Sequence, residues 1–276
     1  MKRRFDQLDV FSAEALRGNP LAVVHDASGL DDARMAAFAR WTNLSETTFL
    51  LPPTDAHADY RVRIFTPGGE LPFAGHPTLG SCHAWLAAGG RPRQAGVVVQ
   101  QCGVGLVKVR RDGARLAFAA PPLRRSGPLD AELLQQIREA LGLDPAEVRA
   151  HQWVDNGPGW CALLLESAER VLSLRPHWPR LGDLKLGLVG PHPAGAEVQF
   201  ELRALIGDGS YEDPVTGSLN ASVAQWLIGA NLAPPRYVAA QGAALQRAGR
   251  VHIHSEGGTV WVGGDVCECI HGEVEL

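Results

Sequence analysis

The order of hydrophobic and polar residues along the chain predicts short strands interrupted by a few helices. Strand-like runs are expected at residues 5–11, 21–24, 47–51 and 60–66, with a turn at 17–20. Residues 30–41 instead carry apolar side chains at helical spacing behind Asp31 and Asp32, which suit the first turn of a helix. The runs at 97–101, 105–110 and 116–119 predict a meander. This first lobe is expected to be a sheet wrapped around one apolar helix, the stretch that ends at residue 86.

The second half of the chain repeats this plan. Prolines at 121–122 and 128 do not suit a central strand, and a helical pattern follows over 129–141. Strands are then expected at 160–166 and 198–206, a helix at 219–228, and strands at 250–254 and 259–262. We therefore predict two similar α+β lobes, residues 1–121 and 122–266, with the C-terminal residues 267–276 completing the first lobe.

Two turns in the chain resemble each other. Residues 72–86 read PFAGHPTLGSCHAWL, and residues 214–227 read PVTGSLNASVAQWL. Placing Pro72 on Pro214 also places Gly75 on Gly217, and both stretches end in Trp-Leu. Chance is the alternative, because proline, glycine and alanine are frequent here. Similar elements flank both copies, which favours an internal duplication.

Each of these turns precedes a helix, whose N-terminus presents unpaired backbone N–H groups and the positive end of the helix dipole. Gly75 and Gly217 permit close approach of a ligand to the backbone, and both helix ends are expected to face one cleft and hold a carboxylate. His76 and Ser218 follow the two glycines, with His76 as a candidate proton donor or hydrogen-bond partner. A helix cap or a surface residue is the alternative for both.

Two acidic residues are further candidates. Glu46 stands just before an apolar strand, where a charged side chain is costly unless it is exposed, paired or protonated. A partly desolvated carboxylate has a raised pKa, which suits proton transfer. Simple exposure at the start of the strand is the alternative for Glu46. Asp213 lies beside the second turn, where it is either part of a site or an acid that stabilises a helix N-terminus.

Composition and charge exclude several classes of protein. The chain of 276 residues is 45% hydrophobic and carries a formal net charge of −4 from interleaved acids and bases, so we expect no nucleic-acid or membrane partner. The N-terminus is too polar for a signal peptide and no stretch approaches the roughly 18 apolar residues of a membrane span, which predicts a cytoplasmic protein.

The cysteines show neither a disulfide framework nor a zinc site. Their count of five is odd, and their spacing matches no zinc motif. Cys267 and Cys269 would be the only metal suspects, but alternate positions on a terminal strand explain them better. We expect reduced, mostly buried thiols and no metal.

Several motifs together resemble the phenazine biosynthesis PhzF-like family. They are NLSETTF at 43–49, RIFTP at 63–67, ELPFAGHPT at 70–78 and EDPVTGS at 212–218, with GNP at 18–20 and QG at 241–242. The resemblance spans nearly the whole chain. It implies a diaminopimelate epimerase-like fold of two pseudo-symmetric lobes, each a mostly antiparallel, barrel-like sheet around a central helix, with the active site in the cleft between them. It also implies a homodimer.

The resemblance further implies a cofactor-independent isomerase. In the best-understood family member a glutamate moves a proton between ring carbons of trans-2,3-dihydro-3-hydroxyanthranilate, and that glutamate corresponds to Glu46. The substrate-contacting residues correspond to His76, Asp213 and Ser218, and Ser45, Gly75 and Gly217 are expected beside them. The predicted substrate is a small carboxylated, amino acid-like metabolite.

Two other functions stay open from the sequence: an amino-acid epimerase that uses Glu46 with His76, and a binding protein without chemistry. Epimerases of this fold that use two facing cysteines are disfavoured, because Gly-His and Gly-Ser stand at the two turns. Many family members have Ala-His where this chain has Leu219 and Asn220, a change expected to alter what fits the cleft.

Overall fold

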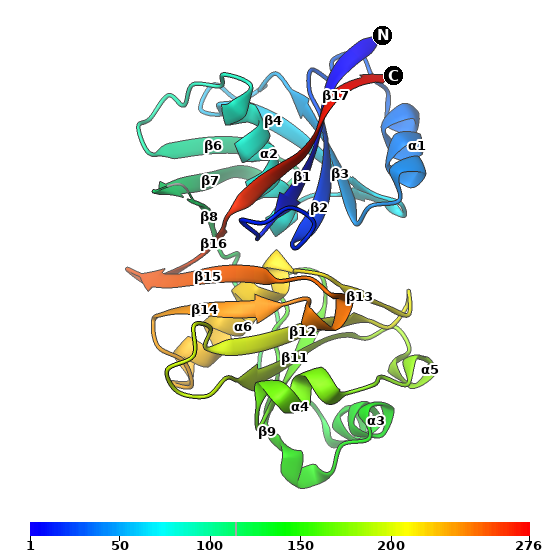
Figure 1. Cartoon of the computed structure of the whole chain (residues 1–276), viewed down its shortest axis with the longest axis vertical. Helices are drawn as coiled ribbons and strands as arrows, with labels where there is room; N and C mark the ends of the chain where they lie inside the picture. The colour runs from blue at the N-terminus through cyan, green and yellow to red at the C-terminus, as the bar shows by residue number, and fades with distance from the viewer. Residues whose placement is uncertain (114) are drawn as a thin grey trace. The chain divides into compact units, whose positions relative to one another are not determined.

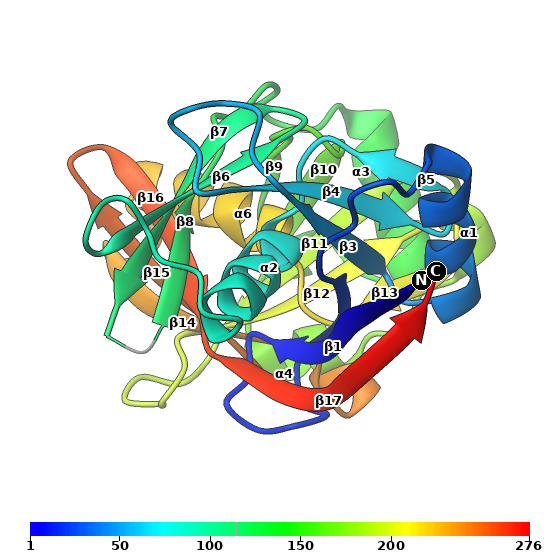
Figure 2. The same cartoon turned by 90° about the horizontal axis from the view of Figure 1, so that it is seen from above.

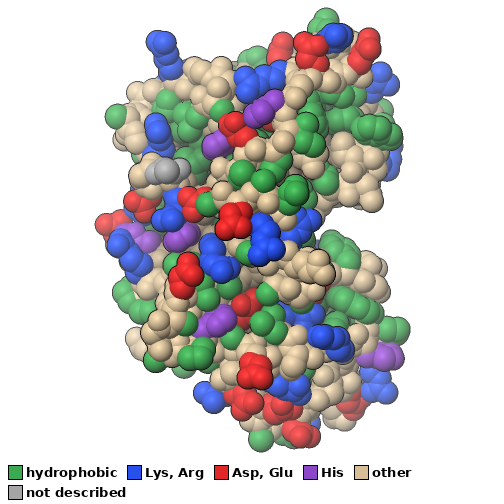
Figure 3. All heavy atoms as spheres, viewed as in Figure 1, with side chains coloured by type: hydrophobic (Ala, Val, Ile, Leu, Met, Phe, Trp, Pro, Cys, Tyr) green, Lys and Arg blue, Asp and Glu red, His purple; other side chains and the backbone are tan. Residues whose placement is uncertain are grey.

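The computed structural model describes residues 1–113 and 115–276, which fold into two compact α+β units (Figure 1). The first unit comprises Met1–Ala119 and Gly263–Leu276, and the second comprises Ala120–Val262. Among the described residues, no helix has the length and apolar character needed to cross a membrane. Basic and acidic side chains are interspersed over the face shown in Figure 3, as the charge pattern predicts.

The first unit is one mixed, mainly antiparallel sheet. Its strands are β1 (Lys2–Val10), β2 (Asn19–Val24), β3 (Glu46–Leu51), β4 (Tyr60–Thr66), β5 (Gly69–Leu71), β6 (Val97–Cys102), β7 (Gly105–Asp112), β8 (Arg115–Ala119) and β17 (Val266–Glu275). The pairing order is β17-β1-β2-β3-β4-β6-β7-β8, with β5 also on β4; the pairs β2–β3 and β4–β6 are parallel. The first and last strands lie side by side, so the chain ends meet (Figure 2).

Two helices accompany this sheet, α1 (Asp32–Thr42) and α2 (Gly75–Ala87). The α1 helix begins where the Asp31 carboxylate accepts a hydrogen bond from the Arg34 N–H and ends at Asn43 in the left-handed conformation. The α2 helix is buried along most of its length and packs on the strands. A Cβ atom on Gly80 would lie 2.4 Å from Leu21, so glycine here permits the close approach of helix and sheet.

The second unit has a similar sheet with more helices. Its elements are α3 (Ala131–Leu141), β9 (Val148–Trp153), β10 (Trp160–Leu165), α4 (Ala168–Ser173), α5 (Trp178–Leu181), β11 (Lys185–Pro191), β12 (Phe200–Ile206), β13 (Tyr211–Asp213), α6 (Gly217–Gly229), β14 (Arg236–Gln241), β15 (Gly249–Glu256) and β16 (Thr259–Gly264). The order β9-β10-β11-β12-β14-β15 carries β13 on β12 and is parallel at β10–β11 and β12–β14. Its α3 helix, α4 helix and strands enclose a leucine-rich core.

The two units repeat one plan. Each unit has four successive strands that pair antiparallel, parallel and antiparallel: β1 to β4 in the first unit and β9 to β12 in the second. A three-residue strand, β5 or β13, and a mostly buried 13-residue helix, α2 or α6, follow. The next strand, β6 or β14, then pairs in parallel with β4 or β12.

One ion pair is also repeated. Arg63 contacts Glu70 at 2.6 Å in the β4–β5 hairpin of the first unit, and Arg203 contacts Glu212 at 2.7 Å in the β12–β13 hairpin of the second. The two pairs occupy matching positions of these hairpins. This match favours duplication over chance similarity.

Most of the predicted elements are confirmed, but the structure also differs from the prediction in several places. The expected turn at 17–20 is wrong at its end, because β2 already begins at Asn19, whose side chain is fully buried. The sequence did not predict the strands β5, β9, β11, β13 and β14 or the short helices α4 and α5. All five cysteines are free thiols: Cys82 and Cys161 are buried, the other three are half-buried, and Cys267 and Cys269 lie on the terminal strand β17 as expected.

Candidate active site

Glu46 and His76 lie together in the first unit. Glu46 is the first residue of β3. Between α1 and β3 the chain passes Asn43, which has the left-handed conformation, and the half-buried Ser45. His76 is the second residue of α2, directly after Gly75. Glu46 Oε2 is 3.4 Å from His76 Nε2, and the two side chains retain only 15% and 5% of their exposure. The carboxylate and the imidazole therefore form a largely dehydrated pair.

The surroundings of His76 keep its imidazole neutral. Burial lowers the pKa of His76 to about 3, and a hydrogen bond to the Pro20 carbonyl opposes this only weakly. Asn19 Nδ2 lies 3.4 Å from His76 Nδ1, so the two ring nitrogens have different neighbours, Asn19 and Glu46. A neutral ring at this place can donate or accept one hydrogen bond without adding a charge.

This burial predicts a pH effect on stability. In the unfolded chain His76 takes up a proton near pH 6.5, whereas in the folded protein it stays neutral down to about pH 3. The wild-type protein should therefore lose about 1.4 kcal/mol of unfolding free energy per pH unit below 6.5 from this residue, or about 2 kcal/mol at pH 5. Above pH 6.5 the contribution vanishes.

Urea unfolding at pH 7, 6 and 5 measures this effect by comparing wild-type protein with His76→Gln. The variant should lose about 2 kcal/mol less than the wild type between pH 6.5 and 5. The pKa of His25 is also lowered, mainly by burial, but His25 is present in both proteins and cancels. Parallel stability profiles would contradict the neutral, buried state of His76.

The N-terminus of α2 is suited to an anion. Its N-cap residue, Ala74, offers no side-chain cap, and the first turn contains no acidic residue. The N–H groups of Gly75 and His76 have no partner within the helix, and Pro77 has no N–H. A carboxylate placed here would meet both backbone donors and the helix dipole.

In the second unit a buried hydrogen-bond network fixes Asp213. Asp213 ends β13, and the Thr216 hydroxyl donates a short hydrogen bond to its carboxylate. The Gln241 amide donates to the Asp213 carbonyl at 3.1 Å and to Thr216 Oγ1 at 3.0 Å, and its oxygen accepts from the Thr216 N–H at 3.0 Å. The turn before α6 is thus held by a residue from β14.

Gly217 and Ser218 begin α6, which resembles α2 in having neither a side-chain cap nor an acidic residue in its first turn. Gly217 is buried. The Ser218 hydroxyl accepts a hydrogen bond from Trp160 Nε1 at 3.0 Å, and its carbonyl accepts from Asn156 Nδ2 at 2.9 Å. Within this unit the structure brings Asp213, Gly217 and Ser218 to one turn.

Leu219 and Asn220 have structural roles within the second unit. Leu219 is buried against Gly187, and Asn220 Nδ2 donates to Gln241 at 2.8 Å and to the Thr216 carbonyl at 3.0 Å. Both side chains are therefore engaged in contacts inside the unit.

Three contributors were not predicted from the sequence: Asn19 beside His76, Gln241 beneath Asp213, and Trp160 on Ser218. The Gly-Asn-Pro and Gln-Gly motifs marked two of these positions without showing what they contact. No motif in the sequence contained Trp160, which is far from Ser218 along the chain.

Comparison with known proteins places the chain in a family. The profile of the phenazine biosynthesis-like (PhzC-PhzF) proteins matches residues 8–270. Antisense-enhancing sequence 1 of Schizosaccharomyces pombe is 35% identical, over 98% of this chain and 97% of its own length. The trans-2,3-dihydro-3-hydroxyanthranilate isomerase of Pseudomonas aeruginosa is 34% identical, over 92% and 91%. The crystal structure of a predicted epimerase from Pseudomonas aeruginosa has a TM-score of 0.79, with 31% identity and 99% of both chains covered.

These similarities, together with the fold, show that the protein is an isomerase. The chain belongs to the phenazine biosynthesis-like PhzC-PhzF family.

Proposed function

We propose that the protein is a cofactor-independent isomerase that uses Glu46 to move a proton between two carbons of a small carboxylated metabolite. The observation that supports this best is the close pair of a largely buried carboxylate and a buried neutral imidazole, with 3.4 Å between Glu46 Oε2 and His76 Nε2. Proton abstraction from carbon needs a base shielded from water and a partner for the developing charge, and this pair provides both.

The proposed reaction balances without a redox partner. The Glu46 carboxylate takes the proton of one C–H bond, and the electron pair left behind spreads into an adjacent conjugated system as an enolate-like anion. Protonated Glu46, whose side chain is 15% exposed, exchanges its hydrogen with the solvent and then protonates a second carbon of that system, so one C–H bond breaks and one forms. The neutral His76 ring stabilises the anion by a hydrogen bond, and the N-terminus of α2 holds the substrate carboxylate.

The substrate class is proposed from the relatives. The similar Pseudomonas aeruginosa isomerase is named for trans-2,3-dihydro-3-hydroxyanthranilate, which carries a carboxylate and an amine on a ring. We propose a substrate of that kind, a small cyclic amino acid, with Ser45 and Gly75 beside it and with Asp213, Gly217 and Ser218 as further binding residues. We also propose a cytoplasmic location, from the polar N-terminal sequence, and a homodimer, from the family resemblance; the mass of the protein in solution tests the dimer.

An epimerase is the second candidate, because a structural relative is described as a predicted epimerase. A pair of thiols does not suit this chemistry here. Burial raises the pKa of Cys82 and of Cys161 to about 12, so both thiols stay protonated at neutral pH and are poor bases. An epimerase of this chain would have to use Glu46 with His76.

A metabolite screen in deuterated water distinguishes the two candidates. Purified protein is incubated with small carboxylated metabolites, and mass spectrometry measures carbon-bound deuterium. We expect deuterium at a new C–H position together with a shifted double bond. Deuterium at Cα with inverted configuration would support the epimerase instead. Tight binding of a metabolite whose C–H bonds never exchange would contradict both.

Asn19 gives a further prediction, because its amide is the neighbour of His76 Nδ1. Asn19→Asp places a carboxylate there, which favours the protonated imidazole and raises the pKa of His76. We expect kcat/KM to fall roughly tenfold, because a protonated His76 ring would pair with the Glu46 carboxylate 3.4 Å away and make it a weaker base.

The ¹⁵N chemical shifts of the His76 ring report its protonation directly and do not depend on a known substrate. The Asn19→Asp variant should show a protonated ring at a pH where the wild-type ring is neutral. Asn231→Asp, an exposed asparagine after α6, is the control and should leave the His76 signals unchanged. Identical His76 titrations in wild type and Asn19→Asp would show that Asn19 does not tune the ring.

A further inference from the structure

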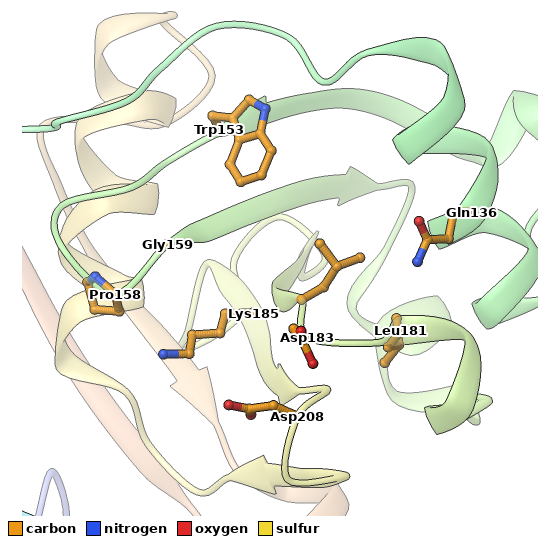
Figure 4. Close-up of a pocket in the computed structure, with 9 residues that line it drawn as sticks. Gln136, Trp153, Pro158, Gly159, Leu181, Asp183, Lys185 and Asp208 are labelled. Atoms are coloured by element: carbon orange, nitrogen blue, oxygen red, sulfur yellow. The ribbon is translucent and has the colours of Figure 1, made fainter. Parts of the chain in front are cut away.

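A pocket lies in the second unit, at the start of β11 (Figure 4). Its volume is about 500 Å³, which lies within the usual range for small-molecule sites. Lys185 and Asp208 lie on one side, the Trp153 ring faces them from another, and the Gln136 side chain reaches in from α3. None of these residues belongs to the proposed Glu46 site.

The internal duplication relates this pocket to the Glu46 site. Glu46 is the first residue of β3 and lies opposite Leu21 in a parallel pair. Lys185 is the first residue of β11 and lies opposite Trp160 in the corresponding parallel pair. Glu46 and Lys185 therefore occupy equivalent positions in the two units.

The strand register fixes this equivalence independently. The next residue along β3 is Thr47, which faces Phe65, and Phe65 faces the glutamate of the first Arg–Glu pair. The next residue along β11 is Leu186, which faces Leu205, and Leu205 faces the glutamate of the second Arg–Glu pair. The second unit thus carries a cation where the first carries the proposed base.

The charges that line the pocket do not neutralise one another. Within residues 1–113 and 115–276, Lys185 Nζ makes no ion pair and neither do the carboxylates of Asp183 and Asp208. Lys185 is half-buried, whereas both aspartates are exposed. A cation and two anions around one space leave room for a ligand that carries both charges.

Trp153 and Gln136 are two other side chains of the pocket that can contact a ligand. The Arg125 guanidinium lies 3.5 Å from the centre of the Trp153 ring and covers one face of it, and the ring points toward the pocket in Figure 4. Gln136 Nε2 donates to the Arg180 carbonyl at 2.8 Å, which fixes the amide and leaves its oxygen for a ligand. A planar apolar group suits the indole, and an N–H donor suits the amide oxygen.

We propose that this pocket binds an aromatic α-amino acid. The ligand carboxylate contacts Lys185, its ammonium lies near Asp183 and Asp208, and its ring packs on Trp153. The duplication has thus left two small-molecule sites: one with a base for chemistry and one with a cation that only holds its ligand. This assignment does not depend on the reaction proposed for Glu46.

Calorimetric titration of the full chain with L-phenylalanine tests the proposal. We expect one molecule bound per chain. Phenethylamine lacks the carboxylate and 3-phenylpropionate lacks the ammonium, and each should bind roughly tenfold more weakly, as for the loss of one charged hydrogen bond. Lys185→Met should weaken L-phenylalanine roughly tenfold, and Asp208→Asn should weaken phenethylamine more than 3-phenylpropionate.

Two control variants locate the binding. Lys108→Met removes an exposed lysine from β7 and should leave the affinity unchanged. Asp213→Asn changes a proposed substrate-binding residue of the Glu46 site and should also leave the affinity for L-phenylalanine unchanged. The proposal is overturned if the wild type gives no binding heat, if Lys185→Met binds as tightly as the wild type, or if Asp213→Asn weakens binding as much as Lys185→Met does.

Discussion

Glu46→Gln protein is expected to lose turnover by a factor on the order of 10³, within the usual contribution of a general acid–base. Glutamine keeps the shape of the side chain and its hydrogen bonding but cannot accept a proton from carbon. Substrate binding should change little, because the helix N-terminus and His76 remain. The loss should therefore appear in kcat rather than in KM, which steady-state kinetics on the substrate from the deuterium screen would measure.

A matched substitution separates this effect from a general loss of charge. Glu197 is exposed in the loop before β12, and Glu197→Gln should keep wild-type kinetics. Both variants should unfold at similar urea concentrations, because neither substitution leaves a cavity. A Glu46→Gln enzyme within about threefold of wild-type turnover would rule out Glu46 as the base.

The buried Arg203–Glu212 pair predicts the largest effect on stability. Both side chains are only 5% exposed, and Arg203 also donates to the carbonyls of Val171 and Leu174. Glu212→Gln leaves the guanidinium buried without its counter-charge. Breaking such a pair costs about 3–5 kcal/mol of unfolding free energy.

The duplication offers an internal control for this prediction. The equivalent pair in the first unit, Arg63 and Glu70, is more exposed, at 16% and 41%, and Arg63 also contacts Asp32 at 2.6 Å. Glu70→Gln should therefore cost less than about 1 kcal/mol. Urea unfolding of the two variants would measure the difference. Equal losses would show that burial of the second pair contributes nothing.

The sequence predicts the strands best where apolar residues alternate cleanly. The run at 60–66 is the strand β4 at the same residues, because one side of it packs in the core while the other carries Arg61 and Arg63. The β11 strand escaped prediction because Gly187 and Gly190 interrupt its apolar run. Tertiary contacts explain both glycines. A Cβ atom on Gly187 would lie 2.6 Å from Leu219, and one on Gly190 would lie 2.2 Å from the Ser167 carbonyl oxygen.

The candidate site was predictable only in part. Motifs marked Glu46 and His76 as candidates, but their proximity depends on how β2, β3 and α2 pack, which no local pattern encodes. The sequence predicts a turn at Asn19, because asparagine before proline is typical of turns, whereas the structure buries its side chain beside His76. The equivalence of Lys185 to Glu46 follows only from the strand register, because the residue types do not show it.

Exchange of carbon-bound hydrogen in deuterated water tests the central claim most directly. Wild-type protein and Glu46→Gln are incubated with the substrate, and mass spectrometry follows deuterium at the two reacting carbons over time. Transfer through Glu46 predicts steady incorporation by the wild type and incorporation slower by a factor on the order of 10³ in the variant. Incorporation at the wild-type rate in Glu46→Gln would contradict the account.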